Sequence, residues 1–250
     1  MIHAFRSEWI KFHTARANLV LIICAIAVPT TITGLIGSLA GLKHSDGEEL
    51  ASIILGPLMV CLILAGVLGV LAIGQEYRHS TIRTTFTAMP RRSTVIAAKV
   101  GSTALFGAAL GALALVISTA LFSIIMSIRG ISFSPSGTDH FGRAAVGFVL
   151  ICAMFALWGF AAGALLRQPA GAIPLLLVYA LVVEGLLGGL LGLAIDGNVL
   201  KWMPFQEGAS LSQLHRGSDW MSWPFGLLYT AAFTGLLVAA GWLVVERRDA

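Results

Sequence analysis

The chain has 250 residues, of which 57% are hydrophobic and only 11% are charged, and its mean hydropathy is +0.89. This composition excludes a soluble globular domain, which needs a polar surface, and predicts that lipid surrounds most of the chain. The net charge of +4 does not indicate nucleic-acid binding, because the basic residues lie in short segments that flank apolar stretches.

The first segment, 1–17, has an amphipathic pattern. Its apolar residues recur at roughly helical spacing, with three cations between them. The apolar residues are Ile2, Phe5, Trp9, Ile10 and Phe12, and the cations are Arg6, Lys11 and Arg16. The pattern predicts a helix in the inner headgroup plane, with its cations toward anionic lipid. The alternative is a basic flank to the first span.

Six apolar stretches with few or no charges follow, and each is long enough as a helix to cross a hydrocarbon core of about 30 Å. They are 18–40, 53–74, 100–126, 144–166, 172–195 and 224–245. We therefore predict an all-α integral membrane protein, one transmembrane domain over 1–250, with both termini on one side. Cys24, Cys61 and Cys152 lie inside these stretches without metal-ligand spacing, so we expect three buried apolar residues.

The distribution of Lys and Arg predicts that both termini face the cytoplasm. With this orientation, eleven basic residues fall in cytoplasmic segments and five in outer ones. The imbalance is the positive-inside pattern of a multi-pass protein of the cell membrane, inner or plasma.

The two longest connections differ in character. The segment 75–99 is predicted to be cytoplasmic and is strongly basic, whereas 196–223 is external and rich in aromatic residues. Aromatic side chains favour the headgroup level, so the external loop is expected to re-enter the membrane in part. An ordinary loop with a belt of tryptophans is the alternative.

The cytoplasmic loop contains a short amphipathic pattern. Ile82, Phe86 and Met89 are spaced to share one helix face, Arg78 and Arg83 point away from it, and Pro90 ends the helix. We predict a short helix against the membrane face that presents a fixed docking surface to a cytoplasmic partner.

The same loop also carries a family resemblance. The third span is preceded by EYRHSTIRTTFTAMPRRSTVIAAK, which resembles the loop between the second and third spans of ABC type-two exporter permeases. A Glu, a Gly-Thr or similar pair, a short helix, a Pro, an Arg and a Lys recur there in order. The matching positions are Glu76, Ser80 with Thr81, Ile82, Pro90, Arg92 and Lys99, with Ser80 in place of the usual Gly.

Other parts of the chain resemble the same family, so the likeness covers nearly the whole sequence. They are Glu8, Trp9 and Lys11 before the first span, Glu184 in the fifth, and Trp202 and Pro204 in the last outer loop. The resemblance implies a dimeric permease, homo- or heterodimeric, that contacts membrane lipids. It also implies two cytoplasmic ATP-binding subunits that drive an amphipathic substrate outward: a drug, a peptide or a lipid-like molecule.

The resemblance places the ATPase-docking surface on the cytoplasmic loop. Its residues are Glu76, Arg78, Thr81, Ile82, Arg83, Phe86, Met89 and Arg92. The chain has no GxxxxGK[ST] segment, so ATP and Mg²⁺ are expected on the partner subunit and no cofactor in this chain. An ion-coupled secondary transporter and a non-transporting interaction protein are the alternatives.

Glu184 is the one charged residue near the middle of a predicted span. An ionised carboxylate that faced lipid there would cost several kcal/mol, so Glu184 is expected to face the bundle or a cavity. It is a candidate for a substrate path or a conformational latch, and the alternative is a structural hydrogen-bonding residue. All six histidines lie outside the spans without metal-binding spacing, and no catalytic residue is predicted.

Glycines spaced four apart occur in several predicted spans and allow close helix approach. The pairs are Gly37 and Gly41, Gly107 and Gly111, Gly159 and Gly163, and Gly185 and Gly189. We expect most of them to serve packing within the chain.

Overall fold

Helices make up nearly all of the regular structure in the computed structural model, which describes residues 16–42, 45–78, 92–194 and 198–248. No β-strand occurs in these ranges, and six segments are long and apolar enough to cross a membrane. The predicted all-α membrane fold with six spans is therefore confirmed. The predicted amphipathic helix over 1–17 lies outside the described residues except for its last two.

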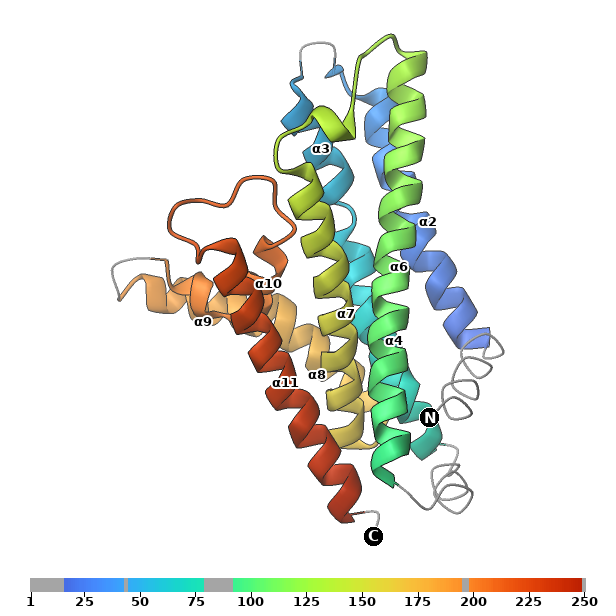
Figure 1. The fold of residues 1–250 in the computed structure, drawn as a ribbon, viewed down its shortest axis with the longest axis vertical. Coiled ribbons are helices and arrows are strands. Elements are labelled where there is room, and N and C mark those ends of the chain that lie inside the picture. The colour runs from blue at the N-terminus through green and yellow to red at the C-terminus, as the bar shows by residue number, and fades with distance from the viewer. Residues whose placement is uncertain (1–15, 43–44, 79–91, 195–197, 249–250) are drawn as a thin grey trace.

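The first four spans stand roughly side by side (Figure 1). The first is α2 (Arg16–Leu39), and the second consists of α3 (Gly47–Leu55) and α4 (Met59–Arg78). The third is α6 (Arg92–Ile128), which a 3-10 turn, η2 (Pro135–Gly137), separates from the fourth, α7 (Phe141–Leu166).

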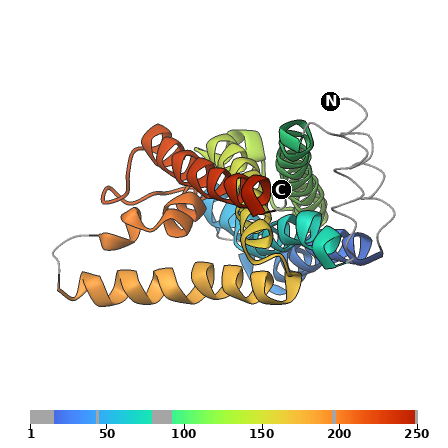
Figure 2. The same cartoon turned by 90° about the horizontal axis from the view of Figure 1, so that it is seen from below.

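The fifth span is one continuous helix inclined to the others (Figures 1 and 2). It consists of α8 (Pro169–Val178), a π-helical turn η3 (Tyr179–Val183) and α9 (Glu184–Gly192). Two short helices follow, η4 (Val199–Trp202) and α10 (Pro204–Ser210), before α11 (Trp223–Arg248) forms the sixth span. We call the end of the bundle where α3 begins and α6 ends the outer end, after the predicted orientation, which itself stays a prediction; α10 lies below it, near the middle of the long axis (Figure 1).

The second span begins earlier than hydropathy predicts. α3 starts at Gly47 rather than at residue 53, and its first turn contains Glu48 and Glu49. The Asp46 side chain caps this turn by accepting a hydrogen bond from the Glu49 backbone N–H at 2.8 Å. Acidic residues stabilise a helix N-terminus, so charges that lower the hydropathy of a window do not end the helix there.

The core is centred on α7, which packs against α4, α6, α8 and α11. The contact with α4 is close enough that only glycine fits at two crossing points. A Cβ on Gly159 would lie 1.9 Å from the Gly66 carbonyl oxygen, and a Cβ on Gly69 would lie 1.8 Å from the Ala156 carbonyl oxygen. By contrast, Gly185 and Gly189 have nothing within 4 Å of a Cβ placed on them.

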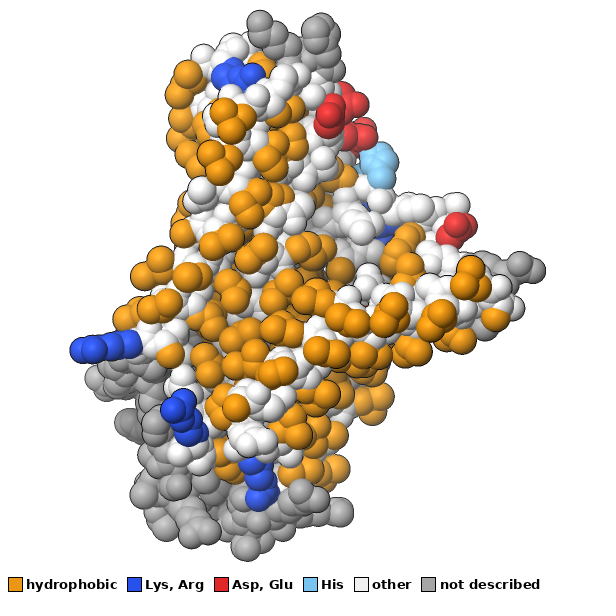
Figure 3. Space-filling view, turned by 180° about the vertical axis from the view of Figure 1, so that it is seen from behind, with side chains coloured by type: hydrophobic (Ala, Val, Ile, Leu, Met, Phe, Trp, Pro, Cys, Tyr) orange, Lys and Arg blue, Asp and Glu red, His pale blue; other side chains and the backbone are white. Residues whose placement is uncertain are grey.

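Apolar side chains cover much of the outer surface of the spans (Figure 3). Such a surface suits lipid, and helices suit the hydrocarbon region because they satisfy their own backbone hydrogen bonds. Cys61 and Cys152 are buried as predicted, but Cys24 is exposed, so the prediction for Cys24 was wrong. In a span, outward-facing positions are as apolar as buried ones, and composition does not separate the two.

The close contact between α4 and α7 predicts a position-dependent effect of alanine. Gly159→Ala forces two backbones apart, and we expect it to lower the free energy of unfolding by about 1–3 kcal/mol. Gly189→Ala is the matched control: it meets open space and improves helix propensity, so its stability should stay the same or rise slightly. Thermal unfolding of both variants in detergent measures the difference, and equal midpoints would contradict the packing.

Candidate functional site

A buried ion pair joins α4 to α6 across the loop that is predicted to be cytoplasmic. Glu76 lies in the last turn of α4, and Lys99 lies about two turns after the start of α6 at Arg92. The Lys99 Nζ lies 2.6 Å from the Glu76 Oε1, and the two side chains are 4% and 8% exposed. Charges buried this deeply are stable only when paired. The pair therefore fixes the spacing of the two helix ends from which the loop extends. We call Glu76, Lys99 and their apolar surroundings the loop base.

The apolar part of the loop base brings four spans together. Its buried members are Ile73 of α4, Ile96 of α6, Phe160 and Ala164 of α7, and Val245 of α11. Tyr77 packs against this cluster, and the Arg167 guanidinium lies 5.6 Å from the centre of the Tyr77 ring, within cation–π range. The loop base is thus packed against both α7 and α11.

The structure describes only part of the predicted docking surface. Glu76 and Arg78 occupy the last turn of α4, where Glu76 is buried and Arg78 is exposed, and Arg92 begins α6. The remaining predicted residues, Thr81, Ile82, Arg83, Phe86 and Met89, lie outside the described residues. ATPase docking on this surface therefore stays a prediction.

Sequence reasoning placed Lys99 in the family pattern but did not recognise it as the partner of Glu76. The signal was a carboxylate before the loop and an ammonium after it, each next to an apolar stretch.

Glu184 is the second buried carboxylate, and the outer helix α10 supplies its partners. Glu184 is 1% exposed, and its carboxylate oxygens accept hydrogen bonds from the backbone N–H of Phe205 at 3.0 and 2.9 Å and of Gln206 at 3.0 Å. These N–H groups belong to the first turn of α10, where Pro204 has none to offer. A carboxylate at this position satisfies unpaired donors and complements the helix dipole.

The backbone around Glu184 departs from a regular α-helix. The π-helical turn η3, which joins α8 to α9, ends directly before Glu184. Such turns are rare and often occur at functional sites. Below α10, Trp158 packs against Tyr179 and Phe205, and its indole N–H donates to the Thr234 hydroxyl at 2.8 Å. Glu184 faces the protein interior, while its role in a substrate path or a latch stays a prediction.

A third buried carboxylate, Glu207, lies in the same first turn of α10. It pairs with Arg216, and the two side chains are 0% and 6% exposed. The carboxylate fits against α11 only because residue 226 is glycine, where a Cβ would lie 2.0 Å from the Glu207 Oε1. Burial raises the pKa of Glu207 above its ordinary value, and Arg216 acts in the opposite direction. Sequence reasoning did not find this pair, although its opposite charges lie in an otherwise apolar loop.

Further contacts fasten the segment around α10 to the spans. The Tyr229 hydroxyl donates to the Trp202 carbonyl at 2.6 Å, and the Trp223 indole N–H donates to the Leu211 carbonyl at 3.3 Å. A Cβ on Gly147 of α7 would lie 2.1 Å from the same Leu211 oxygen. We call α10 with its two carboxylates, Glu184 and Glu207, the outer clasp. It connects the fifth span to the fourth and sixth, and whether it enters the membrane stays a prediction.

The hydrogen bonds of Glu184 predict how firmly α10 is held. Glu184→Gln keeps the shape but removes the charge and leaves one acceptor oxygen where there were two. Hydrogen bonds to a charged group are worth about 1.5–3 kcal/mol, so the backbone amides of Phe205 and Gln206 should exchange about tenfold faster or more. Hydrogen–deuterium exchange measures this rate.

Glu246→Gln is the control for this experiment, because Glu246 is exposed and accepts a hydrogen bond from the Trp242 indole at 3.1 Å, not from α10. It should leave exchange in α10 unchanged. Equal exchange of α10 in wild type and Glu184→Gln would show that the carboxylate does not hold the helix.

The Glu207–Arg216 pair predicts a dependence of stability on pH. An acid whose pKa is raised in the folded state binds its proton more tightly when folded. The stability of the fold therefore falls as the pH rises above the pKa of a glutamate in the unfolded chain, about 4.3. Arg216→Met removes the opposing cation and raises the pKa of Glu207 further. Between about pH 5 and about pH 8 the variant should lose about 1–3 kcal/mol more stability than wild type. Thermal unfolding across this range tests it.

The double variant Arg216→Met, Glu207→Gln is the control, because it has no acid to titrate at this position. Its additional pH dependence should disappear. Parallel pH profiles in wild type and Arg216→Met would contradict the assignment to Glu207.

Comparison with known protein families agrees with this architecture. Residues 4–194 match the model of the ABC-2 family transporter protein, a match that covers the first five spans and the Glu76–Lys99 pair. A comparison with curated proteins found no matching sequence. The family match spans more than half of the chain. The chain therefore belongs to the ABC-2 transporter family and is a multi-pass membrane permease of an ABC transporter.

Proposed function

We propose that the chain is the membrane-spanning subunit of an ATP-driven exporter that moves an amphipathic substrate outward across the cell membrane. In this proposal a separate ATP-binding subunit, which membership in the family implies, docks on the loop 76–92. Two such subunits bind ATP and Mg²⁺ and serve a permease dimer. The observation that supports the proposal best is the buried Glu76–Lys99 pair at the loop base.

The pair matters because a docking loop transmits force only if its ends are fixed to the spans. A loop on loosely packed helix ends would move by itself when a partner pulls on it. Here the two ends are joined by a buried ion pair and packed against α7 and α11 through Phe160, Ala164 and Val245. A displacement of the loop would therefore act on four spans together.

In the same proposal, the outer clasp is the part of the molecule that responds when the spans move. α10 contacts α7, α9 and α11, so movement of these spans relative to one another would change its position. We propose that Glu184 acts as the latch that holds α10 to the fifth span while the outward path is closed.

The docking proposal is tested by capture of the ATPase. The complex is purified from cells that produce the tagged chain, and ATP-binding subunits are identified by their P-loop sequences. Replacement of Arg83 by Glu together with Phe86→Ala and Met89→Ala reverses one charge and removes two apolar contacts. We expect capture to fall about tenfold or more, since interface hot spots are worth about 2 kcal/mol or more each.

Phe225→Ala with Lys43→Glu is the matched control, because it removes an exposed aromatic and reverses a charge at the predicted outer end. It should retain full capture. The docking proposal would be wrong if the wild-type chain captured no ATPase or if the triple variant captured it fully. Neither result would contradict the fold.

A further inference from the structure

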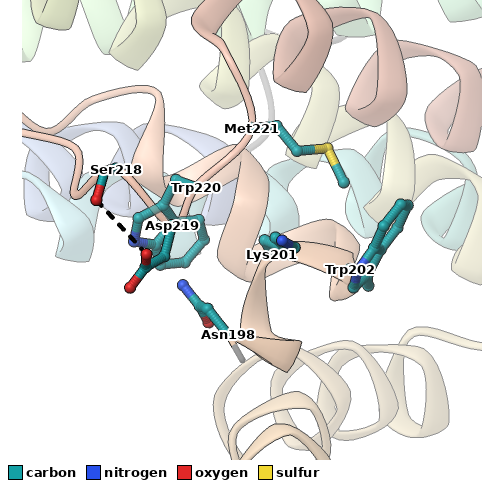
Figure 4. Close-up of a pocket in the computed structure, with 7 residues that line it drawn as sticks. All are labelled: Asn198, Lys201, Trp202, Ser218, Asp219, Trp220 and Met221. Atoms are coloured by element: carbon teal, nitrogen blue, oxygen red, sulfur yellow. Dashed lines mark hydrogen bonds between the residues drawn. The ribbon is translucent and has the colours of Figure 1, made fainter. Parts of the chain in front are cut away.

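A cavity of about 670 Å³ opens beside the outer clasp, between η4 and the segment 218–221 (Figure 4). Its walls include two tryptophans, Trp202 and Trp220, and three polar side chains, Asn198, Lys201 and Asp219. Neither the family match, which ends at residue 194, nor the proposed docking of an ATPase involves these residues.

The cavity contains one positive and one negative side chain that do not pair with each other. Among the residues that the structure describes, neither Lys201 nor Asp219 takes part in a salt bridge. Asp219 accepts a hydrogen bond of 3.5 Å from the Ser218 hydroxyl, and Lys201 is half-buried and has no acidic partner among the described residues. A half-buried ammonium without a counter-charge favours binding of an anion.

Trp202 and Asn198 are held in place by neighbouring contacts. The Trp202 ring meets Tyr229 edge-on at 6.4 Å, and the Trp202 carbonyl accepts from the same tyrosine. The Asn198 Oδ1 accepts from the Leu200 N–H at 3.1 Å, which leaves its Nδ2 as a donor at the cavity. Figure 4 shows this nitrogen on the side of Asp219, with Lys201 between the two tryptophans in the view. The cavity is thus preorganised, with donors and aromatic faces fixed before a ligand arrives.

The position of the cavity in the chain points to the headgroup layer. Its residues follow the end of the fifth span at Gly192 and precede the start of the sixth at Trp223. Tryptophan is enriched at this level of a membrane. A cavity there meets lipid headgroups at high local concentration.

We propose that this cavity binds the zwitterionic headgroup of a membrane phospholipid, in which a phosphate diester is joined to an alkylammonium group. Lys201 faces the phosphate, while Asp219 and the tryptophan rings face the ammonium through charge and cation–π attraction. The negative charge of a purely anionic headgroup would repel Asp219. The positive charge of a simple cation would repel Lys201. Only a ligand with both charges satisfies both side chains.

The proposal is tested by direct binding to the purified chain in maltoside detergent, whose headgroup is uncharged. Saturation-transfer NMR measures binding of glycerophosphocholine, glycerophosphoglycerol and choline. We expect the wild-type chain to bind glycerophosphocholine more tightly than the other two. No nucleotide or ATPase is needed, so the result is independent of the proposed export function.

Two variants assign the charges. Lys201→Gln should weaken glycerophosphocholine binding about tenfold and leave choline binding unchanged or stronger. Asp219→Asn should weaken glycerophosphocholine binding by a similar factor. It should also reduce the preference for glycerophosphocholine over glycerophosphoglycerol. Asp139→Asn, an exposed outer acid away from the cavity, is the control and should bind as wild type. Absence of binding, a preference for glycerophosphoglycerol, or equal binding by all variants would overturn the proposal.

A final comparison distinguishes a lipid from a free headgroup. Dihexanoylphosphatidylcholine, used below its micellar concentration, carries the same headgroup with two short chains. If dihexanoylphosphatidylcholine binds more tightly than glycerophosphocholine, and Lys201→Gln weakens the binding of both, a membrane lipid is supported as the occupant. Equal affinity of the two would mean that the cavity serves a soluble zwitterion, and the lipid assignment would be wrong.

Discussion

The cost of burying a carboxylate away from water governs how the parts of this permease are joined. Among the described residues three glutamates are buried, Glu76, Glu184 and Glu207, and each finds its partner in another segment of the chain. Glu76 joins two spans, Glu184 joins the fifth span to α10, and Glu207 joins α10 to the segment that leads into α11. Because an unpaired buried charge is so unfavourable, each contact also fixes the relative position of the elements it connects.

Hydropathy predicted the six spans because the preference for lipid is a local property of about twenty residues. The burial of Glu184 followed from the same physics, since no ionised group stays in lipid without a partner. Its partners did not follow, because the Phe205 and Gln206 donors are backbone groups some twenty positions later in the chain. Backbone N–H groups have no sequence signature, and they become available only where a helix begins.

Glycine spacing shows the same limit in packing. Four glycine pairs have the same spacing in the sequence, yet Gly159 touches the α4 backbone while Gly189 faces open space. The spacing indicates that one face of a helix has no side chains at these positions, but it does not indicate which helix packs against that face. The loop base was predictable in part, because Glu76 and Lys99 bracket a basic loop, whereas the Glu207–Arg216 pair depends on a glycine notch in α11 that no local pattern indicates.

The fourth span links the loop base to the outer clasp by a short path. Phe160 and Ala164 of α7 belong to the loop base, and Phe155 and Trp158 of the same helix pack against Phe205 of α10. Nine residues of α-helix span only about 14 Å, and helices of this length move as rigid bodies. A displacement of α7 at the loop base must therefore either reach the aromatic contacts under α10 or break them. Close packing permits few intermediate positions, which favours two discrete arrangements of the outer clasp over a gradual one.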